Sequence, residues 1–587
     1  MTGAGAGAGI STPLPGAPEP AAPGRTGEAR QRQGVMRWAW WAALPLGLLY
    51  LILLAHQLDS AIRTTNLDAD AVSGPVISQL FGAAPPSANV VLGTFGWYAT
   101  LLFDLATKWL PYHRQVWEAA PFVMALAGAG LTVWAVWKVA SGWAASLTAV
   151  LLLSTSPVTL RLELSTTQHA PAWFAMALLG AFVVWIERGR MRRWPVTAAL
   201  VVVVGTIVGV NAASDPLVSI AGVAPFGLAV VATRVLAPAR RGTSALWTGV
   251  ATLVVAGVAW GITAFVMSAL AVTRAPGLHT TRIAIGHKNI ENFTLWWKSI
   301  ATIGNGDYFS HPFSPATVLA FVCAMISIAA VASIPWLSWR QLRRRAPAAT
   351  SADTGVTAAT GTAGTTATTG ATGATATTGA TAFYVFWCSS AILLTLAFLF
   401  SAYPSDVESG RYLLGLLYGA SAVVPAAAVG RARTSAVVLA GTCVFALSAV
   451  LSIADRGAVP ALHANRPVTT NVAGEIARIA AREHISVGYA GYWDAAPATW
   501  ATGFRVQVYP VAVCDQRKRL CRADLHFINS WYSPRTHAGS FLLTDPALDS
   551  VWTRPPDLGR PKAVYRLGRL TMYIYPYDLA AKIKTVA

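Results

Sequence analysis

Apolar runs long enough to cross a membrane recur along this whole sequence, and they constrain its fold more than any other feature. A spanning helix needs about 20 predominantly apolar residues, and the chain contains about 11 such runs. Only 12% of its residues are charged, whereas soluble proteins carry about 25%. We therefore predict an α-helical polytopic membrane protein with about 11 transmembrane helices. The runs begin near Trp38, Trp117, Gly142, Pro171, Trp194, Pro216, Ala245, Ala316, Phe383, Tyr412 and Thr434.

Lys and Arg residues indicate which way these helices cross the membrane. Short cytoplasmic loops are enriched in both residues, and basic clusters occupy every second connection here. We predict a multi-pass protein of the cell inner (plasma) membrane, with a cytoplasmic N-terminus and an external tail. The net charge of +19 does not indicate nucleic-acid binding, because the basic residues lie in separate loops between lipid-embedded helices. The clusters comprise Arg30, Arg32, Arg37, Lys138, Arg188, Arg190, Arg192, Arg193, Arg234, Arg240, Arg241, Arg340, Arg343, Arg344, Arg345, Arg431 and Arg433.

The composition divides the chain into three parts. Residues 1–37 are rich in Gly, Ala and Pro and are predicted to form a disordered cytoplasmic arm. Residues 38–454 form the transmembrane domain, which a Thr/Ala/Gly-rich cytoplasmic linker at 346–382 interrupts. Residues 455–587 lack such apolar runs and are predicted to form a small extracytoplasmic α/β domain.

The hydrophobic pattern of the tail predicts both an α-helix and β-strands. Residues 472–483 have helical periodicity, while strands are predicted at 485–489, 506–511, 540–543 and 570–575. Its aromatic residues suit carbohydrate stacking or a small core, and we assign most of them to the core. Cys514 and Cys521 are predicted to form a disulfide because an external compartment permits oxidation. The aromatic residues are Tyr489, Tyr492, Trp493, Trp500, Trp531 and Tyr532.

Threading the chain through a membrane places many acidic residues on the external side. Part of this bias is ordinary, since external loops lose Lys and Arg. The remainder indicates a functional face, because ionisable groups near membrane cavities are functional by default. Asp215 also fits a helix N-cap. The acids concerned are Asp68, Asp70, Glu163, Asp215, Asp406 and Glu408.

Three external loops combine charges in a way that suggests a site. The first contains Asp68-Ala69-Asp70 and then residues 95–105, which read as a helix lying in the membrane interface. The loop 273–315 is positively charged against the topological trend, and an anionic ligand would explain this. The third loop places Asp406, Glu408 and Arg411 at the mouth of a helix.

Together these features resemble the GT-C superfamily of membrane glycosyltransferases, which contains protein O-mannosyltransferases, lipid A aminoarabinose transferases and mycobacterial arabinosyltransferases. The resemblance covers roughly residues 38–451. It rests on the cytoplasmic N-terminus, the acid motif in a long first external loop, the interfacial helix and the Arg411-Tyr412-Leu413 segment. The mannosyltransferase branch commonly has an Asp-Glu pair where this chain has Asp68-Ala69-Asp70.

The resemblance implies transfer of a sugar from a polyprenyl-phosphate donor to a glycan, lipid or protein acceptor of the cell envelope, on the outer face of the membrane. Asp68 or Asp70 would act as the base that takes the acceptor proton. The donor phosphate would be bound by Arg411, Lys288, His279 and His287.

Some of the other polar residues have two interpretations. Glu163 and His169 bind substrate or cap helix ends. Asp406 and Glu408 are predicted to bind substrate, and Arg411 binds phosphate or pairs with one of these two acids. The sequence has no zinc-type spacing of His or Cys, and it leaves open whether a divalent cation binds the acid pair.

The competing function is transport, by a permease or flippase of lipid-linked sugars. A transporter should place ionisable groups within its spans and show related halves. The apolar runs are nearly free of charge and contain no internal repeat, which favours the glycosyltransferase.

Overall fold

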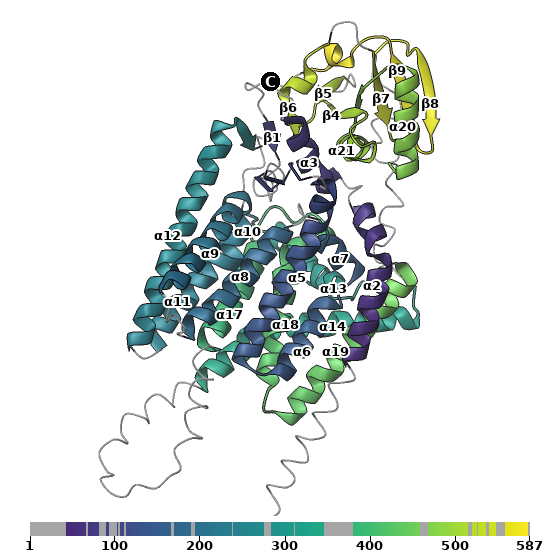
Figure 1. The fold of residues 1–587 in the computed structure, drawn as a ribbon. Helices are drawn as coiled ribbons and strands as arrows, with labels where there is room; N and C mark the ends of the chain where they lie inside the picture. Colours follow the sequence, from purple (N-terminus) through teal and green to yellow (C-terminus); the bar gives the residue numbers. More distant parts are fainter. Residues whose placement is uncertain are drawn as a thin grey trace, which may run out of the picture.

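The computed structural model shows a helical bundle with a mixed α/β domain at one end (Figure 1). The residues that it describes are 43–65, 69–81, 90–92, 102–103, 106–107, 109–110, 113–165, 169–188, 194–236, 239–274, 283–309, 312–344, 380–457, 468–514, 519–524, 526–535, 539–546 and 558–584. The predicted arm at 1–37, most of the linker at 346–382, and most of the interfacial helix at 95–105 lie outside these residues.

The bundle confirms the predicted polytopic membrane fold. Within the described ranges, 10 helices are long and apolar enough to span a membrane, or 11 if one bent pair is counted as a single span. These spans match the apolar runs of the sequence one for one. They are α2 (Ala43–Thr65), α5 (His113–Val139), α6 (Gly142–Leu153) with α7 (Pro157–Glu163), α8 (Ala170–Glu187), α9 (Trp194–Ser214), α10 (Pro216–Val218) with η2 (Ser219–Val223) and α11 (Ala224–Leu236), α12 (Ala239–Ala269), α14 (Pro315–Arg343), α17 (Ala380–Leu399), η3 (Val407–Leu413) with α18 (Leu414–Ala428), and α19 (Ala432–Arg456).

The bent pair corresponds to the apolar run that begins near Gly142. Helices α6 and α7 meet at an angle of 89°. Ser156 caps α7 by accepting a hydrogen bond from the Thr159 backbone N–H, and Pro157 occupies the first turn. Non-helical backbone at membrane depth must be satisfied by protein, and Asn305 meets this need by donating to the Ser154 carbonyl oxygen at 3.4 Å.

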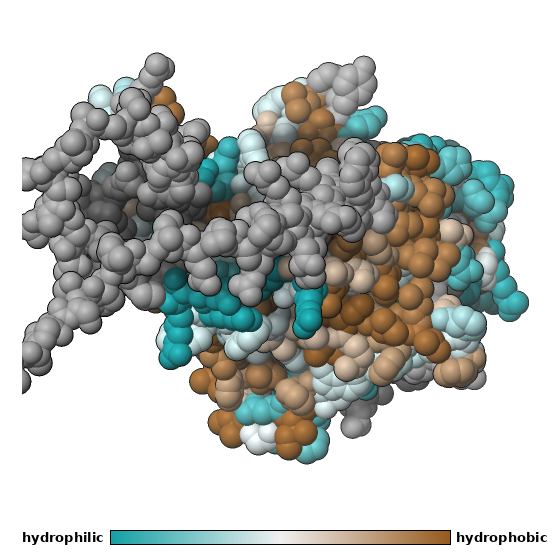
Figure 2. All heavy atoms as spheres, turned by 90° about the horizontal axis from the view of Figure 1, so that it is seen from below, coloured by the Kyte–Doolittle hydropathy of each residue, from teal (hydrophilic) through white to brown (hydrophobic). Residues whose placement is uncertain are grey.

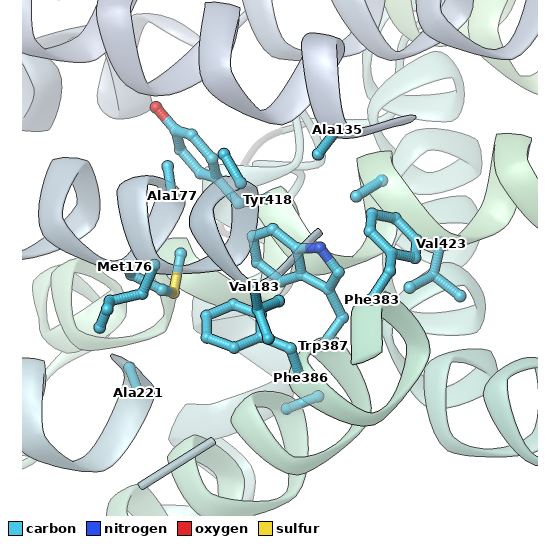
Figure 3. Packing of buried hydrophobic residues seen from close by; sticks show 14 of the residues in the cluster. Ala135, Met176, Ala177, Val183, Ala221, Phe383, Phe386, Trp387, Tyr418 and Val423 are labelled. Atoms are coloured by element: carbon cyan, nitrogen blue, oxygen red, sulfur yellow. The ribbon is translucent and has the colours of Figure 1, made fainter. Parts of the chain in front are cut away.

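Large aromatic side chains pack the centre of the bundle. Trp387 of α17 is 1% exposed and lies close to Phe383, Phe386 and Val423 (Figure 3). The rings of Phe386 and Trp387 meet edge to face, with centroids 5.2 Å apart. Dispersion contacts in such dense packing hold helices together where lipid leaves no hydrophobic drive between them.

Small residues allow the closest helix approach. Gly205 and Gly209, four residues apart on α9, face α12. A Cβ built on Gly209 would lie 2.2 Å from the Ala256 carbonyl oxygen, so only Gly permits this contact. The spacing is the small-xxx-small pattern of membrane helix pairs.

Several helices have basic residues at the end of the bundle that lies away from the α/β domain. Helices α5 and α14 end there with Lys138 and Arg343, and α19 begins there after Arg431. Figure 2, which views the molecule from this end, shows hydrophilic residues beside broad hydrophobic surfaces. These basic helix ends and the α/β domain therefore lie at opposite ends of the bundle.

The α/β domain, called the C-domain below, is built on a six-stranded mixed sheet with strand order β5-β4-β3-β7-β9-β8. Strand β3 pairs in parallel with β4 and β7, and the other pairs are antiparallel. The predicted helix and all four predicted strands are confirmed, whereas α21, β5 and β8 had no clear signal. The elements are α20 (Thr470–Arg482), β3 (Val487–Ala490), α21 (Tyr492–Ala501), β4 (Gln507–Val513), β5 (Leu520–Arg522), β6 (Phe527–Ile528), η5 (Asn529–Tyr532), β7 (Ser540–Thr544), β8 (Ala563–Leu567), β9 (Leu570–Tyr575) and η7 (Leu579–Lys582).

Two loops of the bundle fold together with the C-domain. Helix α3 (Ala69–Phe81) and strand β1 (Val90–Leu92) come from the first loop, and β2 (Val272–Arg274) comes from the loop after α12. Strand β1 pairs with β2 on one side and with β6 of the C-domain on the other. One hydrophobic core joins α3, through residues such as Val72 and Val76, to Trp500 and Trp531 of the C-domain. The C-domain is thus fixed to the bundle by shared structure.

The two tail cysteines form a disulfide in the structure. Cys514 follows β4 and Cys521 lies in β5, with Cα atoms 5.7 Å apart. Cys323, Cys388 and Cys443 lie in spans. Closing so short a loop stabilises a fold by roughly 2–3 kcal/mol in the loop-entropy model.

We expect Cys514 and Cys521 to resist thiol labelling in intact cells until a reductant is added. Mass spectrometry of the labelled protein measures this, with Cys388 in denatured protein as the reactive reference. Labelling of both thiols in untreated cells would exclude the disulfide, whereas protection of the thiols by the inner membrane would reverse the predicted orientation.

Candidate functional site

Asp70 lies where the bundle meets the C-domain. It occupies the first turn of α3, and its side chain is 26% exposed. One carboxylate oxygen, Oδ1, accepts a hydrogen bond of 2.6 Å from the Tyr492 hydroxyl. The other, Oδ2, lies 4.0 Å from an amino group of Arg411. Asp68, the alternative base, lies outside the described residues.

Arg411 comes from the turn that leads into α18. Asp406 starts this turn by accepting a hydrogen bond from the Ser409 backbone N–H at 3.1 Å. The Arg411 guanidinium donates to the Tyr412 hydroxyl at 3.2 Å and lies 5.2 Å from the centre of that ring. Its side chain is 29% exposed, so these contacts hold the guanidinium without burying it completely.

The second acid of this turn has a separate partner. Glu408 forms an ion pair of 3.4 Å with Arg161, a side chain of α7 that is only 8% exposed. This pair ties the turn to the bent span. Among the predicted substrate residues, Asp406 therefore acts as a helix cap and Glu408 as a tether in this structure, while Arg411 faces Asp70.

The basic loop contributes one residue near the turn. Lys288, in the first turn of α13 (His287–Ile303), donates to the Pro404 carbonyl oxygen at 2.7 Å and pairs with Glu291 at 3.2 Å. The bond to Pro404 holds α13 against the segment before Arg411. His287 is 83% exposed and also lies beside Glu291, and the hydrogen bond from Lys288 lowers the pKa of that carboxyl. His279 lies outside the described residues.

A buried His–Asp pair lies on the other side of Tyr412. His169 and Asp215 are bonded through Nδ1 and Oδ2, and their side chains are 2% and 4% exposed. Asp215 also caps α10, as the sequence predicted, by accepting from the Leu217 N–H. The His169 ring meets the edge of the Tyr412 ring with centroids 5.1 Å apart. The pair therefore supports the ring on which Arg411 rests.

A cavity of about 320 Å³ opens below the site, at the lower end of the roughly 300–1,000 Å³ typical of ligand pockets. Its walls are mainly apolar residues of α6, α14, α18 and α19. Leu414, Leu417 and Tyr418 continue the helix that starts beside Arg411. Glu163, at the end of α7, also lines the cavity and is 9% exposed, and within the described residues its carboxyl accepts no hydrogen bond.

Two residues that contact Asp70 and Arg411 were not predicted from the sequence. Tyr492 was one of six tail aromatics assigned mostly to the core, and Tyr489, Trp500 and Trp531 are indeed buried. Tyr412 was noted only within the Arg411-Tyr412-Leu413 segment. Neither pattern signals a contact with a charged partner. No group of three or more His, Cys, Asp or Glu side chains gathers as a metal site in the described parts of the chain.

Comparison with known proteins finds a similar structure but no sequence match. No family model matches the chain, and no curated protein matches it. The chain is similar in structure to ArnT from Cupriavidus metallidurans. The apo crystal structure of that protein has a TM-score of 0.46 and 14% identity, and the one bound to undecaprenyl phosphate has a TM-score of 0.45 and 14% identity. Each comparison covers 89% of this chain and 97% of the other.

Proposed function

We propose that this protein is a GT-C-type membrane glycosyltransferase that uses a polyprenyl-phosphate sugar as donor. The observation that carries this proposal is the approach of Asp70 to Arg411 at 4.0 Å. These residues come from loops far apart in the sequence, and sequence analysis selected them separately, one as a base and the other as a phosphate ligand. Sugar transfer from a lipid phosphate needs both roles within one site.

The two groups account for one displacement step. Asp68 or Asp70 takes the proton from an acceptor hydroxyl as its oxygen forms a bond to the anomeric carbon. The bond between that carbon and the phosphate oxygen breaks, and the electron pair leaves with the polyprenyl phosphate. Arg411 stabilises the negative charge that develops on this phosphate. Lys288, His279 and His287 are proposed as further phosphate ligands, and Glu163 and His169 as residues that orient the sugar.

The cavity suits the lipid part of the donor. A phosphate at Arg411 would have its chain beside Leu414 and Leu417, which follow on the same helix and line the cavity. Apolar walls suit isoprene units, because the two can pack together through dispersion contacts. This continuity from a cation to an apolar space supports an amphiphilic donor over a soluble nucleotide sugar.

The outer face is proposed from the distribution of charge. The basic helix ends lie opposite the C-domain, and cytoplasmic loops carry the excess of Lys and Arg. The site would then lie on the external side, where the acceptor would be a cell-envelope glycan, lipid or protein.

Binding of undecaprenyl phosphate to the purified protein tests the proposal, with undecaprenol as the matched ligand that lacks phosphate. We expect the phosphate to bind at least about tenfold more tightly, because charge-assisted bonds to a guanidinium contribute about 1.5–3 kcal/mol. Native mass spectrometry in detergent measures both ligands. Equal binding of the two lipids contradicts a phosphate site.

Glu163 is the one observation that favours transport. A carboxyl buried at a cavity between spans is typical of proton-coupled carriers. A lipid-linked sugar flippase would need Glu163 for movement of its substrate and would not need Asp68 or Asp70 as a base. If Glu163→Gln abolishes lipid movement while the variant that carries both Asp68→Asn and Asp70→Asn retains it, the protein is a transporter.

A further inference from the structure

The C-domain supplies a residue to the candidate site. The Tyr492 hydroxyl donates its 2.6 Å hydrogen bond to Oδ1 of Asp70, and Tyr492 is the first residue of α21. Oδ2 of the same carboxylate faces Arg411. The two oxygens of Asp70 are therefore oriented by different parts of the protein, one by the C-domain and the other by the bundle.

The position of Tyr492 is fixed within the C-domain. Its ring stacks on the His526 ring, with centroids 5.6 Å apart and an angle of 29° between the planes. His526 is 5% exposed, and burial lowers its pKa to about 3. It therefore remains an uncharged ring at neutral pH. On its other side, Tyr492 meets Trp493 edge to face at 5.1 Å.

The distance between Tyr492 and Asp70 is set by packing of α21 against α3. Val72 and Val76 on α3 share a hydrophobic core with Ala496 and Trp500 on α21. Protein interiors of this kind transmit small shifts because they are close-packed. The hydrogen bond therefore joins two helices that already have a defined relative position.

We propose that Tyr492 is a positioning residue that holds the Asp70 carboxylate in its reactive orientation. Its hydroxyl engages Oδ1 and stops rotation of the carboxylate, which leaves Oδ2 directed at the space beside Arg411. The C-domain is then part of the reaction centre and more than a support. This inference rests on the proposed function, with Asp70 as the base.

Tyr492→Phe tests the inference because it removes only the hydroxyl and keeps the ring on His526. We expect kcat to fall about tenfold, in line with loss of a hydrogen bond to a charged group, with the donor KM within about twofold of the wild type. Tyr565→Phe is the matched control. It removes a 2.8 Å hydrogen bond from a Tyr hydroxyl to Glu483 in the same domain, and its kcat should be unchanged.

A double-mutant cycle separates positioning from a structural role. If Tyr492 acts through Asp70, adding Tyr492→Phe to Asp70→Asn causes no further loss of kcat, because residues that act as a unit are not additive. An equal additional loss in the double variant overturns the inference. An unchanged kcat in Tyr492→Phe, together with an inactive Asp70→Asn variant, also overturns the inference. That result leaves the proposed function intact. Full activity of Asp70→Asn shows that Asp70 is not the base and overturns the inference, while Asp68 stays the base of the proposed function.

Discussion

Replacing both acids of the first loop, Asp68→Asn with Asp70→Asn, is expected to lower turnover by about 100-fold or more, the usual contribution of a general base. The amide keeps the size of the carboxyl and one accepting oxygen, but it cannot accept the proton of the acceptor hydroxyl. The two single variants then identify the base. Initial rates of sugar transfer from a polyprenyl-phosphate donor, measured per folded protein, provide the test.

Asp59→Asn is the matched control for this experiment. Asp59 lies near the end of α2 before the same loop, and it forms an exposed ion pair with Arg63 at 2.8 Å. Exposed pairs of this kind contribute little to stability, and Asp59 lies outside the candidate site, so activity should be unchanged. Full activity in the double Asn variant would exclude both carboxylates as the base and remove the basis of the enzyme assignment.

Arg411→Lys is expected to raise the donor Kd about tenfold although the charge is unchanged. Arg can hold a phosphate through two parallel hydrogen bonds, and Lys cannot reproduce this fork. The loss of its contact with Tyr412 adds to the effect, because the guanidinium rests on that ring. Binding of a polyprenyl-phosphate sugar to the purified variants measures the change.

Arg569→Lys supplies the control for a purely structural arginine. Arg569 pairs with the buried Asp545 at 2.8 Å within the C-domain, so this variant should lose stability and bind the donor normally. If Arg411→Lys behaves in the same way, Arg411 only orders the turn beside Asp70 and the phosphate site lies elsewhere.

The spans and most of the C-domain sheet could be predicted because their signals are local. A run of apolar residues specifies a membrane helix wherever it occurs, and alternation gave strands close to β3, β4, β7 and β9. The break between α6 and α7 also has a local cause, since Ser156 and Pro157 form a cap and first turn within an apolar run.

The assembly of the site could be predicted only in part. Sequence analysis selected Asp70 and Arg411 for their residue types and their places at helix ends. Their meeting at 4.0 Å depends on how α3 and η3 pack, which no local pattern encodes. The ion pair of Arg161 with Glu408 has the same origin.

Burial gives some residues a role that their sequence context does not show. His169 and Asp215 are one example, because each fits a helix end and only the fold brings them together. Tyr492 is another, since an aromatic residue after a strand is most simply a core residue. Its hydroxyl reaches Asp70 because α21 packs on α3, through a core that joins residues far apart in the chain.

The most direct test of the account is release of polyprenyl phosphate by the purified protein in lipid vesicles. The vesicles contain a polyprenyl-phosphate sugar and a cell-envelope extract as acceptor, and product lipid is measured by mass spectrometry. We expect release by the wild type and a loss of about 100-fold or more in the variant that carries both Asp68→Asn and Asp70→Asn. Movement of intact donor between leaflets, with no release above that of the double variant, would contradict it and identify a transporter.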